Sequence, residues 1–144
     1  MTTSFLRPSL FAVACVAALA LASPGLAATV NLKADLKAGS EVPPTDSKGA
    51  GSVTATFDTG TKQLSWKGTV SGLTGPATAA HFHAGEVGKN GGVVVPIAGA
   101  DKGSFEGSAT LTDAQATELM DGKWYVNVHT AANKGGEIRG QVTK

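Results

Sequence analysis

The stretch Val30-Asn31-Leu32-Lys33-Ala34-Asp35-Leu36-Lys37 alternates apolar and polar side chains at every step. Successive side chains of a β-strand point to opposite faces of the sheet, so this period of two is typical of a strand with one buried and one solvated face. The same alternation recurs in the segments 53–57, 64–70, 105–111, 124–130 and 136–142. Residues 93–97 form a short continuous apolar run, which is also compatible with a strand.

Turn-forming residues separate these segments. They are Glu41-Val42-Pro43-Pro44, Asp58-Thr59-Gly60, Thr74-Gly75-Pro76, Lys89-Asn90-Gly91-Gly92 and Asn133-Lys134-Gly135-Gly136. With this spacing we expect about eight short strands, which predicts an all-β sandwich or barrel. The prolines after Glu41 favour a rigid loop that covers a sheet edge, because proline cannot donate to a strand ladder.

One short helix is expected between the strands. Thr112 and Gln115 have the spacing of a capping box, and Gly122 is well placed to end the helix. Because the segment carries Ala116 and Leu119 on one side, we expect it to plug one end of the sandwich.

The N-terminus is predicted to be a secretory signal peptide, residues 1–27, followed by one domain of residues 28–144. Arg7 precedes an apolar run, and small residues suit cleavage after Ala27. The run holds about a dozen residues, fewer than the roughly 20 of a membrane-spanning helix. We therefore expect a periplasmic or secreted protein with no membrane span after cleavage.

Cysteine and charge narrow the functional classes. The only cysteine, Cys15, lies inside the apolar run, where an ordinary leader residue is favoured over a lipidated one. The exported chain then has no thiol, so a bound metal would need nitrogen or oxygen ligands. Loss of Arg7 leaves 11 basic and 11 acidic residues, and this balance offers no basic surface for nucleic acid.

All three histidines of the chain fall in two strand segments, Ala80-His81-Phe82-His83 and Tyr125-Val126-Asn127-Val128-His129. Residues two apart share a face, so His81 and His83 are expected side by side on the outer face, with Phe82 turned to the core. The same rule puts His129 on the outer face. If the two strands are neighbours, three neutral imidazoles converge into a metal site that suits copper, with zinc as the second choice.

Four further residues are expected beside these histidines: Tyr125, Asn127, Glu137 and Arg139. Glu137 could accept the free ring N–H of His129 or supply an oxygen ligand, and Arg139 would add positive charge. Two other interpretations stay open: the histidines are structural, hydrogen-bonding residues, or they transfer protons. No nucleophile–histidine pair or pair of catalytic acids is recognisable, so a binding protein is favoured over an enzyme.

Five landmarks resemble the CHRD domain family, first named in chordin. In order they are Gly39-Ser40-Glu41-Val42-Pro43-Pro44, Ala80-His81-Phe82-His83, Val93-Val94-Val95-Pro96, Trp124-Tyr125-Val126-Asn127-Val128-His129-Thr130 and Gly135-Gly136-Glu137-Ile138-Arg139-Gly140-Gln141. The resemblance covers about residues 29–143. It implies the family and says little about activity, because a fold does not fix a function.

A more distant resemblance is to copper-zinc superoxide dismutase, which also places an HxH pair and a later strand histidine outside its sandwich. This resemblance implies an antiparallel Greek-key β-sandwich, and Arg139 would parallel the anion-guiding arginine of that enzyme. The bridging imidazole, the remaining zinc ligands and the disulfide cysteines of the dismutase have no counterpart here.

Together these patterns favour an exported metal-binding protein that buffers or delivers copper. One alternative is a metal-free adhesion or interaction module, whose outer face contacts a protein or a glycan. The other is a copper-dependent redox enzyme resembling superoxide dismutase.

Overall fold

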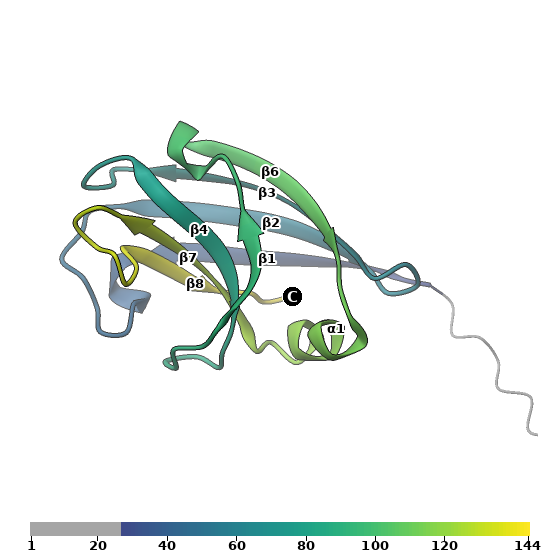
Figure 1. The fold of residues 1–144 in the computed structure, drawn as a ribbon. Helices are drawn as coiled ribbons and strands as arrows, with labels where there is room; N and C mark the ends of the chain where they lie inside the picture. Colours follow the sequence, from purple (N-terminus) through teal and green to yellow (C-terminus); the bar gives the residue numbers. More distant parts are fainter. Residues whose placement is uncertain (1–26) are drawn as a thin grey trace, which may run out of the picture.

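The computed structural model describes residues 27–144 (Figure 1). Except for Ala27, the predicted signal peptide with Cys15 lies outside the described residues. The strands are β1 (Thr29–Lys37), β2 (Ala50–Asp58), β3 (Gln63–Ser71), β4 (Ala77–Ala84), β5 (Val93–Ile97), β6 (Ser104–Thr110), β7 (Trp124–Thr130) and β8 (Ile138–Gln141). Two short 3₁₀ helices, η1 (Ala38–Ser40) and η2 (Ala100–Lys102), and one α-helix, α1 (Asp113–Met120), complete the elements.

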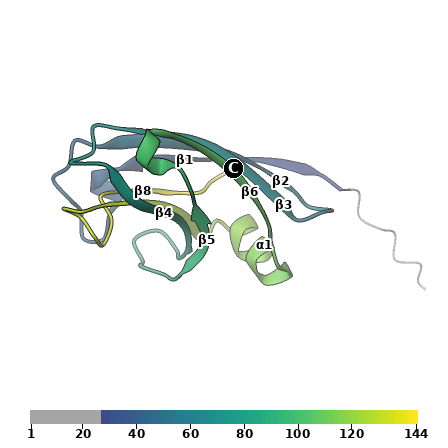
Figure 2. The ribbon, with the colours of Figure 1, turned by 45° about the horizontal axis from the view of Figure 1, so that its top comes forward.

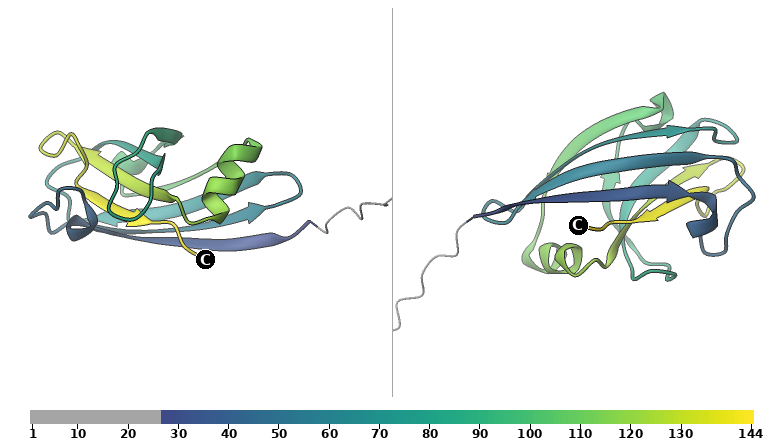
Figure 3. Two further views of the ribbon diagram at one scale, coloured as in Figure 1. Left: turned by 90° about the horizontal axis from the view of Figure 1, so that it is seen from below. Right: turned by 180° about the vertical axis from the view of Figure 1, so that it is seen from behind.

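The eight strands form one antiparallel sheet in the order β5-β4-β7-β8-β1-β2-β3-β6. The sheet curls until its two halves face each other, with β1 to β3 in one layer and β4, β7 and β8 in the other (Figure 3). The edge strands β5 and β6 approach each other at the open side without forming a ladder (Figure 2). The predicted all-β antiparallel sandwich is therefore confirmed, as one nearly closed sheet.

Alternating apolar side chains from both layers fill the space between them. Trp66 and Phe82 meet edge to face with ring centroids 5.2 Å apart, and Phe82 lies 5.9 Å from Trp124. At one end α1 adds the buried Leu119 to this core. The predicted capping box is present, since Thr112 accepts from the Gln115 amide and the Gln115 side chain accepts from the Thr112 amide.

Two loops cover part of the outer face of β7 and β8, which the alternation alone would leave open to solvent. They are the β1–β2 loop, residues 38–49, and the β4–β5 loop, residues 85–92. Tyr125 and Asn127 point away from the core as predicted, yet each is only 3% exposed. The expectation of a solvated outer face is wrong at these two residues, because a period of two tells which way a side chain points and not what packs on it.

Glu41 is part of this cover. The sequence predicts that its segment covers a sheet edge, but η1 packs on β8, in the middle of the sheet. The buried Glu41 carboxylate accepts a 2.7 Å hydrogen bond from the Asn127 amide on β7. Within residues 27–144, no helix has the length and apolar character needed to cross a membrane.

Candidate metal centre

The strands that carry the histidines are neighbours. The antiparallel register of β4 and β7 sets His81 opposite Asn127, and His83 opposite Tyr125. The His81 ring centroid consequently lies 5.5 Å from that of His83 and 5.2 Å from that of His129. The three imidazoles converge on one face, as the sequence predicts.

The ring nitrogens are spaced nearly as a metal ion requires. One nitrogen from each histidine lies within 4.8 Å of the other two, and His81 Nδ1 is 3.3 Å from His129 Nε2. Nitrogen ligands at about 2.0–2.1 Å from a tetrahedral ion lie about 3.3 Å apart. The His81–His129 pair already has this separation, and the third ring nitrogen lies within 4.8 Å.

Backbone carbonyls set the tautomers of two rings. His83 Nδ1 lies 3.0 Å from the Gly91 carbonyl oxygen, and His129 Nδ1 lies 2.9 Å from that of Lys134. A carbonyl oxygen only accepts, so Nδ1 carries the proton in both rings and Nε2 keeps its lone pair. A backbone carbonyl on the second ring nitrogen is a common way in which proteins orient metal-binding histidines.

His81 completes the cluster differently. Its Nδ1 faces His129 Nε2, which has to act as the acceptor because His129 Nδ1 is the donor to Lys134. In the metal-free protein His81 therefore donates from Nδ1. Metal binding through this nitrogen requires that the proton move to Nε2 of the same ring.

The surroundings keep two of the rings neutral. Burial lowers the pKa of His81, and the neighbouring His129 and His83 lower it further. Burial also lowers the pKa of His83; the bond to Gly91 opposes this effect, and the charges of His129 and Arg139 reinforce it. Neutral imidazole is the form that binds a metal, so these shifts favour ligation.

The β4–β5 loop approaches His83 closely because Gly91 has no side chain. A Cβ at this position would overlap the carbonyl oxygen of Ala84. The close approach lets the Gly91 carbonyl reach the His83 ring, and Tyr125 holds the same residue through a 3.0 Å bond from the Gly91 amide to its hydroxyl. Tyr125 also stacks on His83, with ring centroids 4.9 Å apart.

Glu137 does not take the role proposed for it beside His129. Its buried carboxylate accepts hydrogen bonds from Ser47, Thr74, Thr130 and Asn133. Burial opposes its ionisation, but the bonds from Ser47, Thr130 and Thr74 outweigh burial and lower the pKa of Glu137 to about 2. The acceptor for His129 is the Lys134 carbonyl instead.

Asn127 links the histidine face to the carboxyl group of Glu41, for which the sequence predicts only a place in a loop. Burial raises the pKa of Glu41 to about 7, against the opposing effects of Arg139, the Val42 amide and the Asn127 amide. Nothing in the local sequence marks Glu41 as buried. The sequence also does not predict that the carbonyls of Gly91 and Lys134 bind the histidine rings. It predicts only the glycine-rich turns that contain these two residues.

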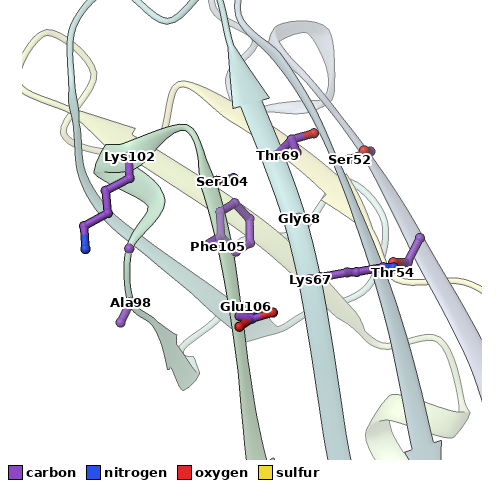
Figure 4. A pocket seen from close by; sticks show the side chains of 11 residues that line it. Ser52, Thr54, Lys67, Gly68, Thr69, Ala98, Lys102, Ser104, Phe105 and Glu106 are labelled. Atoms are coloured by element: carbon purple, nitrogen blue, oxygen red, sulfur yellow. The ribbon is translucent and has the colours of Figure 1, made fainter.

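One pocket of the described residues lies away from the histidines. It has a volume of about 800 Å³ on the outer face of β2, β3 and β6 (Figure 4). Its lining includes Lys67 and Glu106, which are register partners on β3 and β6, and several hydroxyl and apolar side chains. It brings no histidine to its wall, so the candidate chemistry remains at the three-histidine cluster.

Comparison with known families agrees with the resemblance seen in the sequence. A family model described as CHRD domain matches residues 32–142, which is most of the chain. The comparison with curated proteins finds no match.

Proposed function

The chain belongs to the CHRD domain family, and from this premise we propose that it is an exported metal-binding protein that buffers or delivers copper. The metal ligands would be His81, His83 and His129. The family alone does not supply this function; the geometry of the three rings supports it.

The observation that carries the proposal is the state of His83 Nε2. This atom is buried and has no hydrogen-bond partner among the described residues, while the other nitrogen of the ring is held by Gly91. A buried polar atom without a partner is costly, so a purely structural histidine would normally be satisfied on both sides. A metal ion beside His81 and His129 would satisfy this nitrogen.

The ligand set favours copper over zinc. It consists of nitrogen atoms alone, and nitrogen sites bind first-row divalent ions in an order that peaks at copper(II). His81 and His129 remain partly exposed, so one side of the cluster faces solvent. An ion held by three ligands with an accessible side can exchange, which suits buffering or delivery better than a closed structural role.

Calorimetric titration of the purified exported protein tests the proposal. We expect one equivalent of copper(II) to bind at neutral pH, more tightly than zinc. Changing His81, His83 or His129 singly to Ala should weaken binding by more than the roughly 10- to 100-fold typical of residues outside the ligand shell. Thr78→Ala, at an exposed position of β4, is the matched control and should bind normally. No stoichiometric uptake of either metal would leave the interaction module as the better interpretation.

The affinity should depend on pH in a shifted range. Protons compete for the ligand nitrogens, and the pKa values of His81 and His83 lie below the ordinary value of 6.5. Copper should therefore stay bound as the pH falls through about 6.5, and be released only at lower pH. Titrations between about pH 7.5 and pH 5 measure this directly, with a copper-binding peptide of exposed histidines as the reference. Release at the same pH as from the peptide would contradict the prediction.

A further inference from the structure

Arg139 is a buried cation whose charge acts on the buried Glu41, although no salt bridge joins the two. It is 2% exposed, and it forms no salt bridge within residues 27–144. Its Nη1 donates to Asn90 Oδ1 over 2.9 Å and its Nη2 donates to the Lys89 carbonyl. Burying a guanidinium is unfavourable unless its donors find acceptors, and here the β4–β5 loop supplies two acceptors.

The loop segment held by Arg139 is the one that orients His83. Asn90 also donates to the Val42 carbonyl over 3.0 Å, which ties the loop to the β1–β2 loop. The next residue, Gly91, accepts from His83 Nδ1 over 3.0 Å. The contacts of Arg139 therefore fix the two residues immediately before the carbonyl that sets the His83 tautomer.

Tyr125 provides a second connection between the same two residues. The guanidinium carbon of Arg139 lies 3.4 Å from the centroid of the Tyr125 ring. The same ring stacks on His83, with the planes 13° apart, and its hydroxyl accepts from the Gly91 amide. The orientation of the His83 ring and the position of its carbonyl partner both depend on groups that Arg139 touches.

We propose that Arg139 is a positioning residue for the metal centre, which acts through residues 89–91 and Tyr125 to keep the Nε2 lone pair of His83 directed into the cluster. This inference rests on the proposed metal-binding function, because Arg139 can position a metal ligand only if the cluster binds a metal. The geometry that it describes exists in the metal-free protein. It can therefore be measured without any metal.

Nitrogen-15 NMR of the histidine rings in the metal-free protein is the first test. Near pH 8, where imidazoles are neutral, the wild type should show His83 as a single tautomer with an unprotonated Nε2. Arg139→Lys keeps the charge but loses the planar fork that reaches two acceptors, so it should give a mixture of tautomers. Asn90→Ala should have a smaller effect in the same direction. Lys89→Ala is the matched control and should change nothing, because the loop uses only the carbonyl of this residue.

Copper titration of the same variants is the second test. Arg139→Lys should weaken binding by about 10- to 100-fold, Asn90→Ala by less, and Lys89→Ala not at all. If Arg139→Lys and Asn90→Ala both retain a single His83 tautomer and wild-type affinity, the positioning role is wrong while the metal site stands. If the wild type binds no metal, the proposed function fails, and the NMR result still decides whether Arg139 orients His83.

Discussion

Replacing Glu137 with Ala is expected to lower the free energy of unfolding by about 3 to 5 kcal/mol. A loss of this size is typical when a buried hydrogen-bond network is broken. The carboxylate accepts five hydrogen bonds: from Ser47 Oγ at 2.5 Å, the Thr74 amide at 2.8 Å, Thr74 Oγ1 at 2.6 Å, Thr130 Oγ1 at 2.5 Å and Asn133 Nδ2 at 3.1 Å. These donors come from three separate loops and from the end of β7, so loss of the carboxylate would loosen one end of the sandwich.

Denaturant unfolding of Glu137→Ala and Glu137→Gln measures the effect. The Gln variant keeps the shape and one acceptor but turns an amide group toward donors, so its loss should be intermediate. Glu106→Gln, at an exposed position of β6, is the matched control and should stay within about 0.5 kcal/mol of the wild type. A loss below about 1 kcal/mol for Glu137→Ala would contradict the central role of this carboxylate.

The Glu137 carboxylate should also make the folded protein less stable as the pH falls into the acid range. The pKa of Glu137 falls from its ordinary value of 4.5 to about 2 on folding. The folded protein therefore holds this group ionised where the unfolded chain would protonate it. Its contribution is complete above about pH 4.5 and is lost as the pH falls toward 2, and the Gln variant should lack this part of the acid sensitivity.

The strands and the helix could be predicted because their signals are local. Alternation determines which side chains of each strand point inward and which point outward. The capping box of Thr112 and Gln115 marks the start of α1 with only four consecutive residues. The convergence of the histidines depended on a non-local fact, the pairing of β4 with β7. From the sequence alone, the metal site is predicted only if these two strands are neighbours.

The misplacement of Glu137 has a similar physical cause. Alternation from Arg139 puts Glu137 on the outer face, but β8 begins at Ile138 and Gly136 has a φ of 131°. The backbone leaves the extended conformation before Glu137, so the period of two does not apply to it. The cover over Tyr125 was missed because it comes from loops, which have no periodicity to interpret.

Replacing Trp124 with Ala is the second large effect, expected to cost about 3 to 5 kcal/mol, the usual range for a buried large aromatic side chain. Alternation along the last long strand predicts that Trp124 faces the core, and its side chain is fully buried beside Phe82. Truncation would leave a cavity between the two layers. A rigid, nearly closed sheet can collapse into such a cavity only partly.

Trp124→Phe separates packing from hydrogen bonding at this position. The indole N–H is buried and has no acceptor among residues 27–144, so removing it sacrifices no hydrogen bond. The Phe variant should therefore lose clearly less stability than the Ala variant, because it keeps most of the apolar volume and relieves an unsatisfied donor. Val93→Ala, at an exposed position of β5, should stay within about 0.5 kcal/mol and controls for the substitution itself. Denaturant unfolding measures both variants. Equal losses of stability for Phe and Ala would mean that the indole N–H makes a hydrogen bond. A loss below about 1 kcal/mol for Ala would mean that the core does not depend on this ring.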